Sequence, residues 1–428
     1  MTLTRRRLLL ATAGSAAGAA LGHAGAATFA AATAELPRPS RSGLEHIVVV
    51  MMENRSFDHY LGWVPGADGK QAGLVYRDEH GRRHHTHHLT TRQGCGYHDP
   101  SHSYEGGRVQ YNDGRCDGFA RGYNDDFALG YYAKPDLPFY GPLTSAATVC
   151  DRSFASLMAA TLPNRNYAHA GRTDRMRNEY FRSHMPTIWD RLKAAGVPAT
   201  YFYSDVPYLS LWGNRYVQMA QRFDAFLTQA ATGTLPQVSY IDPPVDGRST
   251  YGAADDHPHC DIRRGQAFLS LVAQAIVTSP LWSKTALVIT YDEWGGFFDH
   301  VRPPRRPDER PLDGMDRHQT GFRVPTIVLS PFARRGHVDH GVYDHTSIVK
   351  LISWRFGLRS LAPRDHTARN LAYALDFRRP DASLPLLPVV PDPGPHECGA
   401  PTVGMPGDDD PWAEGLKELA ERSDWRHV

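Results

Sequence analysis

The sequence lacks a strong charge of either sign. Its 428 residues carry a formal net charge of +1, with 47 Lys and Arg against 46 Asp and Glu. It also has no basic stretch interleaved with aromatic side chains. Because nucleic acids are polyanions, the proteins that bind them usually carry a basic face. We therefore expect no nucleic acid among the partners of this protein.

Cysteine is scarce, and its spacing argues against a structural zinc site. The 5 cysteines show neither a CxxC motif nor zinc-ribbon spacing: Cys95, Cys116, Cys150, Cys260 and Cys398. In an oxidising compartment such residues can form disulfides. By proximity in the chain, Cys95 with Cys116 is the first pairing to expect, although an odd count leaves one thiol over and the sequence does not fix the connectivity.

Long apolar runs are absent beyond the first residues of the chain. Thr4-Arg-Arg-Arg-Leu-Leu-Leu10 precedes an Ala- and Gly-rich stretch that extends to about Ala34. This pattern predicts a twin-arginine signal peptide over residues 1–34, with a short membrane anchor as the alternative. The expected partner is the twin-arginine export machinery, and the expected location is secreted or in the cell envelope after export of the folded protein.

The rest of the chain alternates between strand-like and helix-like segments. The patterns predict strands over residues 44–52, 199–203, 238–241, 286–290 and 324–330, and helices over residues 188–195, 264–278 and 347–356. Such alternation is typical of an α/β fold with a doubly wound, mostly parallel sheet.

The composition also divides the chain into regions. We predict one catalytic domain over residues 44–380, in which the loop-rich stretch of residues 63–135 forms a cap or insertion. Within it, the run His84–His88 is expected to be a solvated hairpin and not a metal site. Residues 381–428 are predicted to be a Pro-rich peripheral tail, and whether its final amphipathic segment packs on the domain stays open.

Two of the predicted strands end on paired oxygen donors. Glu53 and Asn54 follow the first strand, and Asp292 and Glu293 follow the strand at residues 286–290. Because the carboxyl ends of parallel strands meet at one edge of a sheet, we expect these side chains to share one divalent metal ion. Oxygen donors accept calcium, magnesium, manganese, zinc or iron, so the identity of the metal stays open.

Thr161 is the candidate nucleophile. It stands shortly before Pro163, at the expected start of a helix. A helix N-terminus offers unpaired N–H groups and a partial positive charge, and a nearby metal would lower the pKa of the hydroxyl. The alternative is that Thr161 only caps the helix.

Five ordered segments carry a family resemblance: Glu53-Asn-Arg-Ser-Phe-Asp-His-Tyr-Leu-Gly62, Thr161-Leu-Pro-Asn-Arg165, Asp256-His-Pro258, Asp292-Glu-Trp-Gly-Gly-Phe-Phe-Asp-His-Val301 and Asp344-His-Thr-Ser347. From about residue 44 to about residue 378 the chain resembles the bacterial phosphoesterase family of phospholipases C and acid phosphatases. That family belongs to the alkaline phosphatase superfamily, so the resemblance implies an alkaline-phosphatase-like fold.

The resemblance also implies roles for individual residues. It implies that Glu53, Asn54, Asp292 and Glu293 hold a single metal and that Thr161 is the covalent phosphoryl acceptor. It further implies that histidines supply charge and protons around the phosphoryl group. His102 and His257 match the active-site positions best; His300 is a weaker candidate with a structural role as its alternative, and His345 ranks no higher.

These residues together predict an exported, metal-dependent phosphoesterase. The first expectation is a phospholipase C that hydrolyses phosphodiesters such as phosphatidylcholine through a phosphothreonine intermediate, with possible peripheral contact at the membrane surface. The aromatics between Tyr97 and Tyr140 could line a choline pocket, although packing within the cap is the simpler interpretation. The alternatives are an acid phosphatase, or a noncatalytic surface-binding protein that retains the fold.

Overall fold

Runs of buried aliphatic residues determine the centre of this fold. The computed structural model describes residues 35–245, 252–309, 312–316, 318–396, 398 and 412–425, and residues 36–428 belong to one unit of mutual contacts. The predicted signal peptide at residues 1–34 lies outside the described residues. Within the described part of the chain, no helix is long and apolar enough to cross a membrane.

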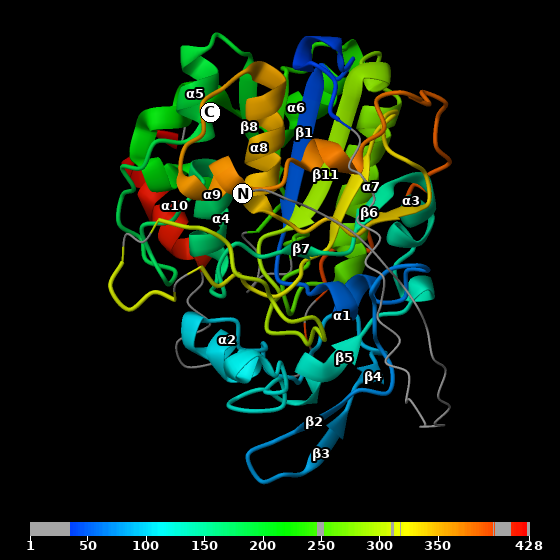
Figure 1. Cartoon of the computed structure of the whole chain (residues 1–428), viewed down its shortest axis with the longest axis vertical. Helices are drawn as coiled ribbons and strands as arrows, with labels where there is room; N and C mark the ends of the chain where they lie inside the picture. Colours follow the sequence, from blue (N-terminus) through cyan, green and yellow to red (C-terminus); the bar gives the residue numbers. More distant parts are fainter. Residues whose placement is uncertain are drawn as a thin grey trace, which may run out of the picture. The chain divides into compact units, whose positions relative to one another are not determined.

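An eight-stranded sheet forms the middle layer (Figure 1). Its strands, in spatial order, are β13 (His337–Asp339), β6 (Thr148–Cys150), β12 (Thr326–Leu329), β11 (Thr285–Tyr291), β1 (His46–Met52), β10 (Val238–Asp242), β8 (Ala199–Tyr203) and β9 (Ala220–Arg222). All five predicted strands are present as β1, β8, β10, β11 and β12. No sequence pattern predicts β6, β9 or β13, because segments this short show no measurable periodicity.

The central strands run parallel, as predicted. β1 pairs in parallel with both β10 and β11, and the register places Met52 opposite Tyr291 and Val50 opposite Ile241. β8 and β9 continue in parallel beyond β10. β12 runs the opposite way, since it pairs antiparallel with β11 and with β6. The residues that follow β1 and β11 therefore meet at one edge of the sheet.

Helices cover both faces of the sheet, which confirms the doubly wound α/β fold. Val48 and Val50 of β1 belong to one hydrophobic core, whereas Ile47 and Val49 belong to another. The first core includes α3 (Tyr140–Ala146), α6 (Phe223–Thr232) and α7 (Ile262–Val277). The second includes α4 (Thr161–Ala170), α5 (Ile188–Ala194), α8 (His345–Phe356) and α10 (Trp412–Arg422). A strand buried on both faces reads as a continuous apolar run, and this explains the sequence of β1.

The predicted cap contains only short elements. They are β2 (Val75–Arg77), β3 (Arg83–His85), β4 (His87–His88), α2 (Tyr104–Tyr111) and β5 (Gly130–Tyr131), and Figure 1 shows them gathered beyond one end of the sheet. The predicted hairpin is present only in part: β2 and β3 pair antiparallel and include His84 and His85, whereas His87 and His88 form β4, which pairs in parallel with β5. In this hairpin the ring of His84 lies between Asp78 and Asp126. The remaining short α-helices and strands are α1 (Phe57–Leu61), α9 (Pro363–Thr367), β7 (Ser153–Phe154) and β14 (Tyr343–Asp344).

The C-terminal tail packs along the domain. Its backbone accepts a hydrogen bond from Ser270 Oγ at Pro388 and one from Gln274 Nε2 at Leu387, both of which come from α7. The final helix, α10, also packs on the domain, with Leu416 fully buried. Residues 381–396 therefore form a strap that is held at several points.

The disulfide expected from proximity in the chain is wrong. Cys95 is bonded to Cys398, with Cα atoms 5.3 Å apart and a sequence separation of 303 residues. The strap follows α7 toward the cap, where Gln93 Nε2 donates to the carbonyl of His396 at 2.7 Å. This path brings Cys398 next to Cys95, while Cys116 remains a buried free thiol.

Candidate active site at the carboxyl edge of the sheet

The edge formed by β1 and β11 carries the four predicted metal ligands. Glu53 and Asn54 follow β1, Asp292 and Glu293 follow β11, and all four side chains are buried. The N–H of Asn54 donates to Asp292 Oδ1 at 3.3 Å, and the N–H of Asp292 donates to the carbonyl of Met52 at 3.1 Å. The structure thus brings together two strand ends that lie 238 residues apart in the chain.

The backbone at these strand ends has a specific local conformation. Asn54 has a φ of 58°, in the left-handed region that Asn tolerates better than most residues. Gly295 has a φ of +64°, and a Cβ atom placed there would lie 2.1 Å from the carbonyl oxygen of Asn54. The N–H of Gly295 donates to Glu293 Oε2 at 2.7 Å. Glycine is therefore required for the close approach of the two ligand-bearing turns.

The electrostatics of the site fit a divalent cation. Burial raises the pKa of Asp292, although the Arg165 guanidinium opposes this shift. Burial also raises the pKa of Glu293 well above its usual range, with His102 opposing the shift and Asp292 adding to it. Among the described residues, neither Glu293 Oε1 nor Asn54 Oδ1 has a hydrogen-bond partner. Buried polar oxygens without donors are costly, and hard cations take carboxylate and amide oxygens as ligands.

The buried side chain of Arg165 contacts two of the predicted ligands, Glu53 and Asp292. Arg165 Nη2 donates to Glu53 Oε1 at 3.1 Å, Nη1 donates to Asp242 Oδ1 at 2.9 Å, and Nε donates to Asp292 Oδ2 at 3.4 Å. These three carboxylates raise the pKa of Arg165 above its usual value against the effect of burial, so the guanidinium is charged. Part of the negative charge at this edge is therefore balanced from within the protein.

Thr161 is the first residue of α4, as predicted. Ala160 occupies the N-cap position and offers no capping side chain, and the N–H of Leu162 instead donates to Asn178 Oδ1 at 2.9 Å. The Oγ1 atom of Thr161 is buried and has no hydrogen-bond partner among the described residues. Its hydroxyl therefore does not serve as the helix cap, which was the alternative role. Asn164 shapes the preceding turn, because its Oδ1 accepts from the N–H of Leu157 at 2.9 Å.

Two of the predicted histidines lie together beside the ligands. His102 Nε2 lies 3.3 Å from Asn54 Nδ2, and His102 Nδ1 lies 2.7 Å from the carbonyl oxygen of Pro100. The rings of His102 and His257 have centroids 5.7 Å apart, and His257 Nε2 lies 3.6 Å from Asp99 Oδ2. A histidine that contacts a predicted ligand and a second one paired with a carboxylate are suited to proton transfer.

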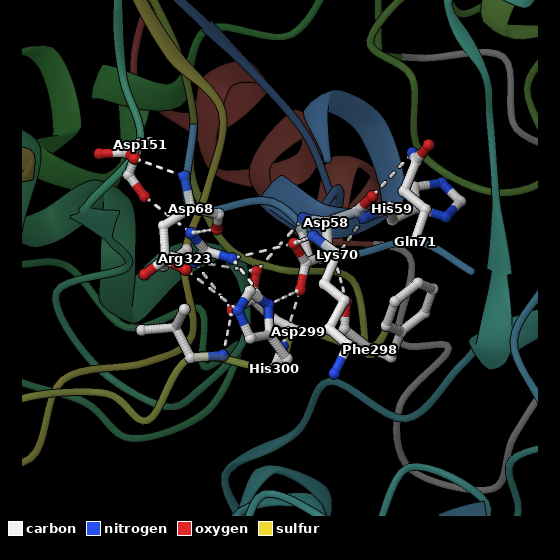
Figure 2. Close-up of polar contacts among 12 residues, drawn as sticks. Asp58, His59, Asp68, Lys70, Gln71, Asp151, Phe298, Asp299, His300 and Arg323 are labelled. Carbon is white, nitrogen blue, oxygen red and sulfur yellow. Dashed lines mark hydrogen bonds and ion pairs between the residues drawn. The ribbon is translucent and has the colours of Figure 1, made fainter. Parts of the chain in front are cut away.

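His300 lies in a different cluster, which Figure 2 shows. Its Nδ1 lies 2.5 Å from Asp58 Oδ2 and its Nε2 lies 3.3 Å from Asp68 Oδ1. Arg323 donates to Asp58 Oδ1 at 3.0 Å and to Asp299 Oδ1 at 2.9 Å. Asp58, Asp299 and His300 come close enough to one another to suggest a metal site. However, each carboxylate oxygen of Asp58 and Asp299 accepts a hydrogen bond, so Arg323 and His300 already satisfy this cluster.

His345 lies beneath β11. Its Nε2 lies 2.9 Å from the carbonyl oxygen of Tyr291, and the side chain is fully buried at the start of α8. Burial lowers the pKa of His345 to about 4, and the hydrogen bond to Tyr291 only partly offsets this. These contacts fit a structural role for His345, in which its neutral ring holds the end of β11 through the Tyr291 carbonyl.

Comparison with known proteins assigns the chain to a family. A model of the phosphoesterase family matches residues 44–359. The chain belongs to the phosphoesterase family. It is therefore a hydrolase that acts on phosphate ester bonds, and the family resemblance found in the sequence is confirmed. This phosphoesterase is 31% identical over 379 residues to non-specific phospholipase C1 of Arabidopsis thaliana, an alignment that covers 77% of this chain and 70% of that protein.

Two further proteins are similar to this phosphoesterase. Phospholipase C A of Mycobacterium tuberculosis is 29% identical over 474 residues, which covers 91% of this chain and 89% of that protein. Among solved structures, a protein in the alkaline phosphatase superfamily from Vibrio parahaemolyticus aligns with a TM-score of 0.40 and 10% identity, over 77% of this chain and 70% of that one.

Several residues of this phosphoesterase contact the site although they were not among the predicted site residues. Arg165 and Asp242 form ion pairs beneath the ligands, and Asp99 contacts His257. The role of Arg165 could have been predicted from the sequence, because it stands four residues after Thr161 and therefore lies on the same face of α4. The role of Asp242 could also have been predicted, since it ends a strand next to β1.

Proposed function

We propose that this phosphoesterase is a metal-dependent enzyme of the phospholipase C type, which hydrolyses phosphodiesters such as phosphatidylcholine through a phosphothreonine intermediate. Three buried oxygens carry this proposal: Thr161 Oγ1, Asn54 Oδ1 and Glu293 Oε1, none of which has a hydrogen-bond partner among the described residues. One is the predicted nucleophile and two belong to predicted ligands. The names of the relatives, which are phospholipases C, support the substrate class.

Glu53, Asn54, Asp292 and Glu293 would hold one divalent cation in this proposal. All four donors are oxygen atoms, and three of the four are carboxylates, as hard cations prefer. When bound, the cation supplies a Lewis acid that lowers the pKa of the Thr161 hydroxyl and offsets charge on the phosphoryl oxygens. The burial of the donors excludes water that would otherwise weaken these interactions.

The residues of the chain then divide the reaction into two steps. In the first, Thr161 Oγ forms a bond to phosphorus as the bond to the diacylglycerol oxygen breaks, and the hydroxyl proton passes to water. His102 or His257 gives a proton to the departing oxygen. In the second step, water attacks phosphorus and the Oγ–P bond breaks, so that the proton lost by this water passes to Thr161 Oγ and phosphocholine departs. The histidine then regains its proton from solvent, which received the Thr161 proton in the first step. The positive end of α4 favours the charge that develops on the phosphoryl group.

A substrate panel tests the proposed activity. Phosphatidylcholine, other phosphatidyl lipids and p-nitrophenyl phosphate are incubated with the protein as purified, after chelation, and after each divalent metal is restored. We expect diacylglycerol release from phosphatidylcholine that chelation abolishes and one metal restores. Turnover of the monoester alone would instead identify a phosphatase, and no turnover of any ester would favour a noncatalytic binding protein.

Two substitutions of the nucleophile test the covalent step. Thr161→Ala removes the hydroxyl and should reduce turnover by roughly 10³-fold or more. Thr161→Ser keeps a hydroxyl in the same position and should retain measurable activity. Undiminished turnover in Thr161→Ala would refute the covalent mechanism whatever the substrate.

We also propose that the phosphoesterase is exported and meets its lipid substrate at a membrane surface. The Cys95–Cys398 bond supports export, because structural disulfides persist in oxidising compartments. Fusion of residues 1–34 to a reporter that is active only after folded export tests this proposal. Replacement of Arg5, Arg6 and Arg7 by Lys should block export of the reporter, and unchanged export would contradict a twin-arginine route.

A further inference from the structure

Arg165 connects helix α4 with the ends of three neighbouring strands. Its guanidinium donates to Glu53 Oε1 at 3.1 Å, to Asp292 Oδ2 at 3.4 Å and to Asp242 Oδ1 at 2.9 Å. Glu53 follows β1 and Asp292 follows β11, whereas Asp242 is the last residue of β10. These three strands are neighbours in the sheet. One side chain therefore spans the whole edge at which the predicted ligands gather.

We propose that Arg165 is a positioning residue, which fixes the Thr161 hydroxyl relative to the carboxylates that would hold the metal. Thr161 and Arg165 are separated by one turn of α4, so their side chains lie on the same face of the helix. A displacement of the guanidinium from Glu53 and Asp292 would move the first turn of α4 with it. This inference rests on the proposed function, because it concerns the geometry of that reaction.

The chemistry of arginine suits this role. Each of the three guanidinium nitrogens of Arg165 meets a different carboxylate, which the single nitrogen of a lysine cannot do. The side chain is 1% exposed, so water does not compete for these hydrogen bonds. The other oxygen of Asp242 accepts a hydrogen bond from the hydroxyl of Tyr201. Asp242 is thus a fixed anchor that is separate from the predicted ligands.

A buried arginine next to a metal site can act through its charge or through its geometry, and these effects have opposite signs. Its positive charge repels a metal cation and would weaken binding. Its planar fork instead orients Glu53 and Asp292, and ordered ligands bind a metal more tightly. Arg165→Lys keeps the charge and loses the fork, whereas Arg165→Gln loses both. The lysine variant therefore separates the two effects.

The experiment uses the full chain after chelation. Thermal unfolding is followed during titration with Mg²⁺, Ca²⁺, Mn²⁺ or Zn²⁺, and bound metal is counted by mass spectrometry. For Arg165→Lys we expect about tenfold weaker binding of the metal that stabilises the wild type. We also expect kcat to fall by about 100-fold while KM changes much less, since misplacement of a nucleophile affects the chemical step.

Arg175→Lys is the matched control. Arg175 is equally buried, but its ion pair is with Asp174 and its other hydrogen bonds are to backbone carbonyls of residues 179 and 181. This variant should be less stable than the wild type and bind the metal with unchanged affinity. Should Arg165→Lys fail to fold, Asp242→Asn tests the same fork by replacing its charged anchor with a neutral acceptor, with an expected loss in metal affinity of about threefold or more.

The possible outcomes separate the two proposals. Wild-type protein that no ion stabilises and that cleaves no ester rejects the proposed function. A stable wild-type metal complex together with unchanged affinity and kcat in Arg165→Lys overturns the positioning role and leaves the proposed function intact. Tighter metal binding in Arg165→Gln, with wild-type behaviour in Arg165→Lys, would assign the residue an electrostatic role instead. Unchanged affinity in Asp242→Asn would likewise contradict the positioning role if the lysine variant does not fold.

Discussion

The Nδ1 atom of His300 lies 2.5 Å from Oδ2 of Asp58, and this contact joins the two segments that follow the predicted ligand pairs. Asp58 lies in α1, just after Glu53 and Asn54, whereas His300 follows the turn that begins at Glu293. Arg323 lies on the other side of Asp58 (Figure 2). The same cluster therefore contacts both segments that follow the predicted ligands.

This contact predicts that His300 stabilises the protein most at acidic pH. Burial lowers the pKa of His300, but Asp58 and Asp299 raise it more, so the pKa lies above its ordinary value; Asp68 and Arg323 are the other charged groups that face the ring. A raised pKa gives stability that is full below the unfolded value of about 6.5 and is lost as pH rises through the folded value.

The measurement is the difference in Tm between wild type and His300→Gln from acidic to alkaline pH. The difference should be largest at the acidic end and should shrink as pH rises. His366→Gln, at an exposed histidine, is the control and should show little difference at any pH. A difference that grows toward alkaline pH would contradict the assignment of the Asp58 contact.

Gly295→Ala should destabilise the protein by roughly 2 kcal/mol or more, because the new Cβ would collide with the backbone of Asn54. Gly196→Ala is a matched control, since Gly196 has a φ of +65° with no atom near its Cβ position. That variant carries only the conformational cost, about 1 kcal/mol. Denaturant unfolding of both variants measures the difference, and equal losses would argue against the close approach.

Glu293→Gln should have opposite effects on the metal-free and metal-loaded protein. Burial raises the pKa of Glu293, so the unfolded state releases this proton first, and the metal-free wild type loses stability as pH rises from the unfolded to the folded pKa. At neutral pH the metal-free variant should therefore melt above the metal-free wild type. Added metal should stabilise the wild type far more than the variant. A variant that is less stable in both states would instead indicate a purely structural carboxylate.

Cys398→Ser should lower stability by about 2–5 kcal/mol, because the Cys95–Cys398 bond closes a very long loop. Limited proteolysis should then cut within the strap at residues 381–396 faster than in the wild type. Reductant should lower the Tm of the wild type and leave that of the variant unchanged. A cross-linked peptide that joins Cys95 to Cys116 would contradict the observed connectivity.

Local sequence was sufficient to predict the centre of the fold. β1, β8, β10 and β11 could be predicted because each is a buried run long enough to show strand character, and the acidic residues that follow them mark the edge of the sheet. The antiparallel direction of β12 was not predictable in this way, because a run of apolar residues does not indicate whether its strand runs parallel or antiparallel to its neighbours. The Cys95–Cys398 bond depends on the path of the strap over α7, which only the packed structure determines.

The supporting residues of the site were harder to predict for a related reason. Arg165 and Arg323 each contact carboxylates from distant parts of the chain, so their roles depend on tertiary contacts. A repeated tripeptide could have indicated the Arg323 cluster. Phe-Asp-His occurs at residues 57–59 and again at residues 298–300, each time shortly after a ligand pair. Both aspartates of the repeat bind Arg323.

In the proposed mechanism Thr161 becomes covalently phosphorylated during turnover, and rapid quenching can trap this intermediate. Protein mixed with phosphatidylcholine and the restoring metal is stopped with acid within one turnover, and the peptide that contains Thr161 is analysed by mass spectrometry. We predict a phosphocholine adduct on Thr161 that appears before free phosphocholine and is absent from Thr161→Ala. Full turnover without any adduct, or an adduct that persists in Thr161→Ala, would contradict the account.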